Sequence, residues 1–143
     1  MTKIDFHTNV ADKITYTCRL VRKARTAALE SRIIILLRDK SELAALDQAL
    51  WTFSAQDFLP HASVDEAIAS QSPVVLTDSD SRELPHHDIL VNLSGTLPTS
   101  FAQFERVFEI ITQEPTDTEV GRERYGYYRQ RGYALTHFVA SQS

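Results

Sequence analysis

The first half of the chain alternates short hydrophobic runs with amphipathic stretches. The runs "KIDFH" at residues 3–7 and "RIIILL" at residues 32–37 are rich in branched and aromatic side chains, which is typical of strands. Residues 11–29 and 39–51 instead repeat apolar side chains at helical spacing. The apolar stripes are Ile14, Cys18, Val21, Ala24 and Ala28 in the first helix, and Leu43, Leu46, Ala49 and Leu50 in the second. Expected helix caps are Thr8 or Asn9 for the first and Asp39 or Ser41 for the second.

This strand–helix–strand–helix order predicts the fold class. A continuous β-branched run such as "RIIILL" is typical of a strand buried on both faces in a parallel sheet. We therefore predict an α/β fold: a doubly wound, mostly parallel sheet with helices on both faces. Because the chain contains no repeats and no linker, residues 1–143 are expected to form a single domain.

The second half predicts shorter elements. Residues 53–63 and 63–70 are expected to be connections with a helical turn each, and residues 79–87 a solvated polar turn between strands at 73–78 and 87–94. Residues 99–112 begin like a helix, with Thr99 or Ser100 as its cap, and end like a strand. Pro115 is expected to break the chain before a last helix that runs from Thr116 or Asp117 to about Arg131, where Gly132 ends it.

Composition and charge narrow the classes of function. The 43% hydrophobic and 24% charged residues are ordinary for a globular domain, and no apolar run approaches the ~20 residues that span a bilayer. We expect a cytoplasmic protein without a membrane contact. The net charge of −4 disfavours wholesale nucleic-acid binding, yet residues 121–133 contain four arginines and one glutamate. Such a local cluster of positive charge is suited to bind an acidic partner of limited size.

The sequence lacks the motifs that several kinds of chemistry require. The turns after the first two strands contain no glycines, which a phosphate-binding turn requires. His61, His86, His87 and Asp88 are poorly spaced for a shared metal, and a solvated turn is the simpler interpretation. Cys18 falls on an apolar stripe, as a small core residue would. Acidic residues are scattered singly, so no catalytic pair is evident. We expect no enzyme activity, metal or cofactor.

The basic segment arranges its side chains by helical geometry. Thr118, Arg122, Tyr125 and Arg129 share one stripe, while Arg124, Tyr128 and Arg131 lie on a different side. One interpretation is that tyrosines, above all Tyr128, face the core and the arginines are merely solvated. The other is a site for a peptide with carboxylates and an aromatic end, because guanidinium groups bind carboxylates in paired bonds and a ring offers an apolar wall.

Two stretches resemble a known family. "LDQALWTFSAQDFLPH", residues 46–61, and "RERYGYYRQRGY", residues 122–133, together with "DILVNL" between them, are similar to the chi subunit of bacterial DNA polymerase III holoenzyme. The resemblance covers most of the chain and is weakest at residues 62–88. It implies a Rossmann-like fold and a non-catalytic adaptor. Its implied partners are the psi subunit, which links to the clamp loader, and the acidic, phenylalanine-ended tail of single-stranded DNA-binding protein, with little or no direct DNA binding.

The resemblance also assigns residues. At the tail site, Arg122, Tyr125 and Arg129 match the family, whereas two positions that are often lysine in the family are Gly126 and Thr118 here. At the psi interface, Trp51 and Phe58 match, and Pro60 and His61 adjoin them. From the residues alone, the favoured interpretation is that both aromatics close the core, because large aromatic side chains are mostly buried.

Two alternatives to the adaptor remain. A direct binder of single-stranded nucleic acid would use the basic residues of the first helix, Arg19, Arg22, Lys23 and Arg25, together with the arginines near the C-terminus, provided that the two regions are contiguous. A degenerate nucleotide-binding enzyme would bind a mononucleotide at the first strand–helix turn, which the missing glycines oppose.

Overall fold

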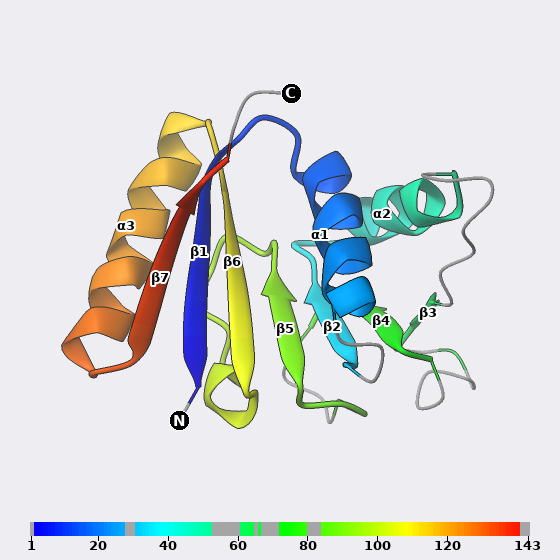
Figure 1. The fold of residues 1–143 in the computed structure, drawn as a ribbon. Helices are drawn as coiled ribbons and strands as arrows, with labels where there is room; N and C mark the ends of the chain where they lie inside the picture. Colours follow the sequence, from blue (N-terminus) through cyan, green and yellow to red (C-terminus); the bar gives the residue numbers. More distant parts are fainter. Residues whose placement is uncertain are drawn as a thin grey trace.

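Parallel strands form the centre of the molecule (Figure 1). The computed structural model describes residues 2–27, 31–52, 61–64, 66, 72–79 and 84–140. Within these ranges the elements are β1 (Lys3–Val10), α1 (Lys13–Ala27), β2 (Ile33–Leu36), α2 (Lys40–Thr52), β3 (His61–Ser63), β4 (Val74–Thr77), β5 (Ile89–Asn92), the 3-10 helix η2 (Phe101–Gln103), β6 (Arg106–Thr112), α3 (Pro115–Gln130) and β7 (Ala134–Val139). The strands lie in the order β3-β4-β2-β5-β6-β1-β7, and each neighbouring pair is parallel. The predicted α/β class is confirmed.

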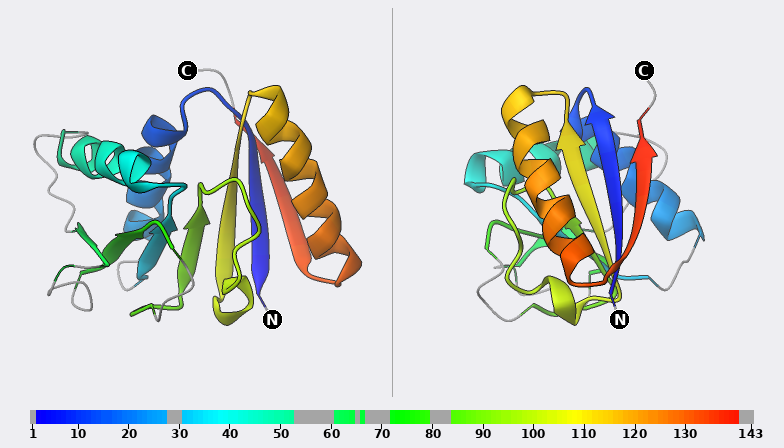
Figure 2. Two further views of the ribbon diagram at one scale, coloured as in Figure 1. Left: turned by 180° about the vertical axis from the view of Figure 1, so that it is seen from behind. Right: turned by 90° about the vertical axis from the view of Figure 1, so that its left-hand side faces the viewer.

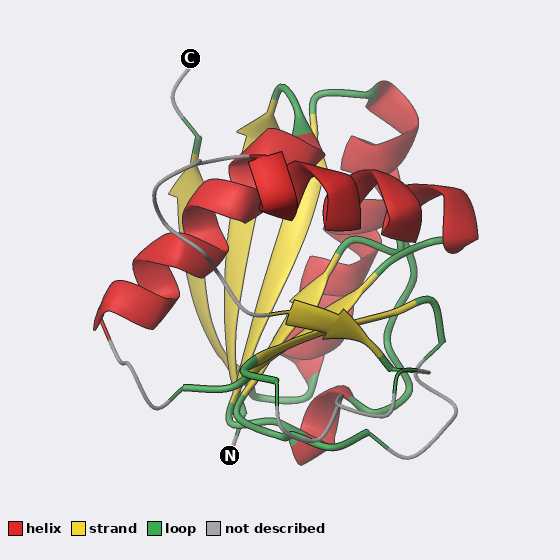
Figure 3. Cartoon of the chain, turned by 90° about the vertical axis from the view of Figure 1, so that its right-hand side faces the viewer, coloured by secondary structure: helices red, strands yellow, loops and turns green. Residues whose placement is uncertain are grey.

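Helices cover both faces of this sheet (Figures 2 and 3). On one face, α1 and α2 bury the predicted stripe residues Cys18, Val21, Leu46 and Leu50 against the strands. On the other face, α3 and η2 contribute Tyr128 and Phe101, among others, to a second apolar cluster. Every residue of β2 is buried, as its β-branched run predicts for a strand with a helical layer on each side.

The helix caps are partly as predicted. Asp39 caps α2, because its Oδ1 accepts a hydrogen bond from the backbone N–H of Glu42 at 2.9 Å. The prediction for α1 was wrong, since Thr8 and Asn9 lie within β1. Asp12 takes that role, with Oδ1 accepting from the backbone N–H of Ile14 at 3.0 Å. The first strand therefore continues further toward the helix than the apolar run alone indicates.

The two edge strands were missed. β3 falls in a segment predicted to be a connection, and no element was predicted where β7 forms. β7 pairs in parallel with β1, with Lys3 opposite Ala134. The helix expected from residue 99 is only the short 3-10 helix η2. The strand expected at the end of that segment is β6. The turn at residues 79–87 is not wholly solvated, because His86 is buried and its Nε2 donates to the Ser72 carbonyl at 2.8 Å.

Candidate functional site

Both ends of α3 are fixed by local contacts. Pro115 does not break the chain but begins the helix, where its missing N–H forfeits no intrahelical bond. Asp117 accepts hydrogen bonds from the backbone N–H and the hydroxyl of Thr112, the last residue of β6, at 2.7 and 2.9 Å. Gly132 ends the helix as predicted, with a φ of 80°. These contacts set the rotation of α3 and therefore decide which side chains face the sheet.

The side of α3 that faces the sheet carries a buried polar network. Glu109 of β6 is fully buried and accepts hydrogen bonds from Asn92 Nδ2 at 2.9 Å, Arg124 Nε at 3.1 Å and the Tyr128 hydroxyl at 2.7 Å. Burial raises the pKa of Glu109, while the charge of Arg124 and the hydrogen bonds from Tyr128 and Asn92 oppose that rise. The network joins β5, β6 and α3.

This network explains part of the basic segment. Tyr128 is buried as predicted, and Arg124 points away from the stripe of Thr118, Arg122, Tyr125 and Arg129, also as predicted. Arg124 is not a solvated surface arginine, however, because it is only 5% exposed. The role of Glu109 was missed. The available signal was a charged residue in the middle of the apolar run of β6, which calls for a buried partner.

The opposite flank of α3 forms a groove with the sheet. Its volume is about 510 Å³, and we call it the α3 groove. The lining residues are Phe6, Thr8, Ile111, Thr118, Gly121, Arg122, Tyr125, Gly126, Arg129 and His137. All of the residues predicted for the tail site line this one groove. The helical stripe read from the sequence thus corresponds to a real concavity beside β1 and β7, which lie next to α3 in Figure 1.

The groove combines an apolar floor with a cationic rim. Phe6 and Ile111 are buried, and the Phe6 ring meets Tyr125 edge to face with centroids 5.0 Å apart. Arg122 and Arg129 are exposed. None of the described lining residues is acidic. Such a groove is suited to bind a ring on its floor and carboxylates at its rim.

His137 is a groove residue that the sequence did not predict. It lies on β7 with its Nε2 2.7 Å from the Thr8 hydroxyl, and its ring centroid is 6.4 Å from that of Tyr125. It therefore forms the wall opposite α3. A helical stripe cannot indicate which strand lies across from it, although the aromatic and β-branched residues of "ALTHFV" could have suggested a strand.

Two glycines of α3 are expected to respond oppositely to alanine. A Cβ on Gly121 would lie 2.8 Å from Cδ1 of the buried Ile111, so Gly121→Ala should destabilise the fold by about 1 to 2 kcal/mol through overpacking. A Cβ on Gly126 would meet nothing within 4 Å, so Gly126→Ala should stabilise it by about 0.5 to 1 kcal/mol through helix propensity. Urea unfolding measures both changes. A neutral Gly121→Ala would contradict the close approach of α3 to β6.

The second predicted interface is described in part. Trp51, in the last turn of α2, is 49% exposed, and its ring centroid lies 4.7 Å from that of His61. His61 Nε2 lies 3.1 Å from Asp47 Oδ1, and the His61 side chain is buried. The Trp51 ring is therefore half-exposed at the surface and packs against His61, which in turn lies beside Asp47. Phe58 and Pro60 lie outside the described residues.

The basic residues of α1 do not adjoin those of α3. Helices α1 and α3 cover opposite faces of the sheet (Figure 2). Arg25 of α1 donates to the backbone carbonyl of Ser31, which ties it to the start of the next segment. The contiguous basic surface that a direct nucleic-acid binder would form from Arg19, Arg22, Lys23 and Arg25 with the α3 arginines is therefore not formed.

The structure also bears on the single cysteine, on metal ligands and on membrane-spanning segments. Cys18 is buried in the core, and desolvation raises the pKa of its thiol to about 11. Across the described ranges, histidine, cysteine and acidic side chains form no cluster of three or more suited to a metal ion. The described helices include none with the length and apolar content to cross a membrane.

Comparison with known proteins points to one family. The family model of the DNA polymerase III chi subunit, HolC, matches residues 1–136. The chain is 30% identical to DNA polymerase III subunit chi of Pseudomonas aeruginosa over 141 residues, which is 94% of each protein. It is also 30% identical to the Escherichia coli subunit chi over 104 residues, covering 73% of this chain and 71% of that protein. The Haemophilus influenzae subunit chi is 24% identical over 105 residues, or 73% of each. The chain therefore belongs to the family of DNA polymerase III chi subunits.

Proposed function

We propose that the protein is a non-catalytic adaptor of the replicase. In this proposal the α3 groove binds the acidic, phenylalanine-ended C-terminal tail of single-stranded DNA-binding protein. The surface around Trp51 binds the psi subunit, through which the adaptor is linked to the clamp loader. The observation that carries the proposal is the convergence of Thr118, Arg122, Tyr125, Gly126 and Arg129 on one groove.

The groove has the chemistry that such a tail requires. The terminal phenyl ring would lie against Phe6, Ile111 and Tyr125, and its burial would supply the apolar part of the affinity. The terminal carboxylate and the upstream aspartates would pair with Arg122 and Arg129 at the rim. Since no described lining residue is acidic, nothing in the groove repels an anionic peptide.

Two separate titrations, one with a peptide and one with an oligonucleotide, test this function. The full chain is titrated with a fluorescent peptide that is acidic and ends in phenylalanine, and separately with a single-stranded oligonucleotide, each over a range of salt concentrations. We expect the peptide to bind at physiological salt, more weakly as salt rises, and the oligonucleotide not to bind. Oligonucleotide binding without peptide binding would refute the adaptor.

Restoring a cation at Gly126 should strengthen tail binding. Gly126 lines the groove, and a Cβ there has free space around it. Gly126→Lys should lower the dissociation constant of the tail peptide about two- to fivefold at low salt, because it adds a charge at a partly exposed rim. Gly126→Gln is the matched neutral control and should leave affinity nearly unchanged. An equal gain with glutamine would assign the effect to helix stability instead of charge.

Substitution of Trp51 should weaken binding at one proposed interface and leave the other unchanged. Exposed aromatics are common anchors of protein interfaces, so Trp51→Ala should weaken binding of a psi subunit by about tenfold or more. Tail-peptide affinity should change less than about twofold, because Trp51 does not line the α3 groove. Calorimetry with each ligand measures both affinities, and Arg122→Ala provides the reciprocal control. Equal loss of both ligands would indicate misfolding.

A further inference from the structure

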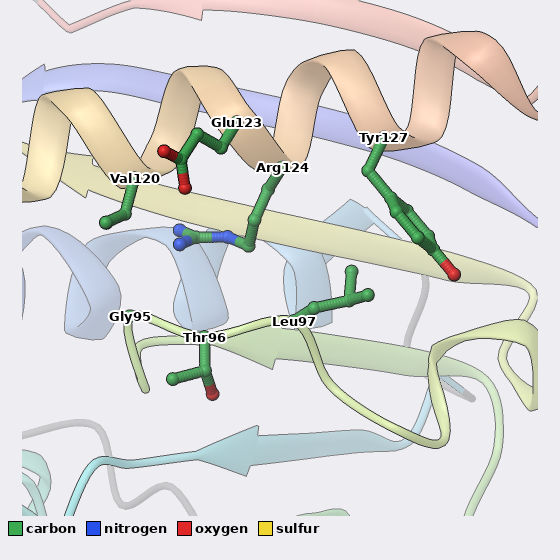
Figure 4. Close-up of a pocket in the computed structure, with 7 residues that line it drawn as sticks. All are labelled: Gly95, Thr96, Leu97, Val120, Glu123, Arg124 and Tyr127. Carbon is green, nitrogen blue, oxygen red and sulfur yellow. The ribbon is translucent and has the colours of Figure 1, made fainter.

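A second cavity lies on the other flank of α3, away from the α3 groove. Its volume is about 290 Å³, and it is lined by Gly95, Thr96, Leu97, Val120, Glu123, Arg124 and Tyr127. Figure 4 shows the side chain of Arg124 extending from α3 across this space toward the segment Gly95–Leu97. We call this space the Arg124 cavity. It is separate from both interfaces of the proposed adaptor.

Arg124 brings unused hydrogen-bond donors into this cavity. The residue is 5% exposed, and its Nε donates to Glu109 Oε1 at 3.1 Å. Nη1 and Nη2 are also buried, yet neither has a partner in the described part of the chain. Leaving a buried charged donor unpaired is unfavourable, because the group has lost its hydration without gaining a hydrogen bond in exchange. The site is therefore built for an acceptor that comes from outside the described residues.

One wall of the cavity is the segment that follows β5, next to a point where the chain switches from one face of the sheet to the other. Strands β2 and β5 are neighbours, but the chain leaves β2 toward α2 on one face and leaves β5 toward η2 on the other. Such a switch point between parallel strands opens a crevice at their carboxyl ends. Gly95–Leu97 follow the carboxyl end of β5, and Asn92 Nδ2 donates to the Thr96 carbonyl at 2.8 Å, which fixes this segment to the buried network.

We propose that the Arg124 cavity binds the carboxylate of a small, mostly apolar organic acid through Nη1 and Nη2 of Arg124. A planar guanidinium edge with two free nitrogens matches the two oxygens of a carboxylate. Val120, Leu97 and Tyr127 supply apolar walls for a short carbon chain. The volume suits an acid of a few carbon atoms.

The negative charge of Glu123 limits the net negative charge of a ligand that the cavity can bind. It is an exposed lining residue whose carboxylate faces the same space (Figure 4). A monocarboxylate would accept hydrogen bonds from Nη1 and Nη2 of Arg124, whose charge is shared with Glu109, whereas a dianion such as phosphate would place a second negative charge beside Glu109 and Glu123. The cavity should therefore discriminate between monocarboxylates and multiply charged anions.

Nuclear magnetic resonance of the arginine side chains tests this site. The full chain, labelled with ¹⁵N, is titrated with isovalerate, phosphate or isoamylamine at constant ionic strength, and Arg124→Lys identifies the Nε–Hε signal of Arg124. We expect isovalerate to shift that signal saturably, with a dissociation constant on the order of 1 mM. Phosphate should shift it less at equal concentration, and the amine should not shift it.

Three variants locate the bound carboxylate. Val120→Trp fills the cavity from a wall position and should weaken isovalerate binding by about tenfold or more, with circular dichroism confirming the fold. Glu123→Gln removes a like charge and should tighten binding about two- to fivefold. Arg122→Ala, in the α3 groove, should not change the Arg124 response. An unresponsive Arg124 signal, a response that survives Val120→Trp or is lost with Arg122→Ala, or a stronger response to phosphate would each overturn the proposal.

Discussion

Replacing Arg124 with methionine should destabilise the fold by about 3 to 5 kcal/mol, the cost of leaving a buried charge without its partner. Glu109 is fully buried, and Arg124 supplies the positive charge within its hydrogen-bond network. Asn92 and Tyr128 would still donate to Glu109, but neither carries a charge to offset that of the carboxylate. Urea unfolding of the variant and of the parent protein measures the loss.

The loss of stability caused by Arg124→Met should grow as the pH rises. Burial raises the pKa of Glu109 in the folded protein, and the charge of Arg124 opposes that rise, so methionine should raise the pKa further. A carboxyl group whose pKa is higher in the folded than in the unfolded state binds more protons when folded. Its contribution to stability is therefore present at low pH and is lost as the pH rises through the folded pKa. Unfolding between about pH 5 and pH 8 should reveal this slope.

Two variants separate the charge effect from simple loss of packing. Arg122→Met removes an exposed arginine from the same helix and should change stability by less than about 0.5 kcal/mol. Adding Glu109→Gln to Arg124→Met removes the uncompensated charge and should abolish the extra dependence on pH. A small, pH-independent loss with Arg124→Met alone would mean that Glu109 is already protonated in the parent protein.

The sequence predicted the elements whose pattern is local. The stripes of α1 and α2 and the uniform run of β2 are each determined by residues within one element, and all of them bury the positions expected. The edge strands β3 and β7 are shorter or less apolar, and they are held by pairing with distant strands. Exposure along most of β7 explains the weak signal, because an edge strand does not need a continuous apolar run.

The same distinction holds for the residues of the candidate site. Those related by spacing within one helix were predicted, and those brought together by tertiary pairing were not. Arg122, Tyr125 and Arg129 were found because helical spacing alone places them on one stripe. His137 was missed because its place opposite Tyr125 depends on the pairing of β7 with β1. Glu109 was missed because its partners come from β5 and α3. Side chains that meet through tertiary pairing leave no periodic trace in the sequence.

The strongest test of the α3 groove is the loss of one guanidinium. Arg122→Ala should weaken binding of the tail peptide by about 1.5 to 3 kcal/mol, or roughly 10- to 150-fold, because it removes a charged hydrogen-bonded pair with a carboxylate. Fluorescence anisotropy with the labelled peptide measures this loss. Since Arg122 is exposed and no core hydrogen bond within the described residues depends on it, the unfolding midpoint should stay unchanged.

Arg131 provides the matched control for this prediction. It is an exposed arginine at the end of the same helix, but its guanidinium carbon lies 3.5 Å from the centre of the Tyr127 ring and it does not line the groove. Arg131→Ala removes the same charge from the same helix and should weaken the peptide less than about twofold. Equal losses from both variants would assign binding to the general positive field of the C-terminal segment. A loss confined to Arg122 would mean that the peptide contacts the groove itself, because only a direct contact distinguishes two arginines of equal charge.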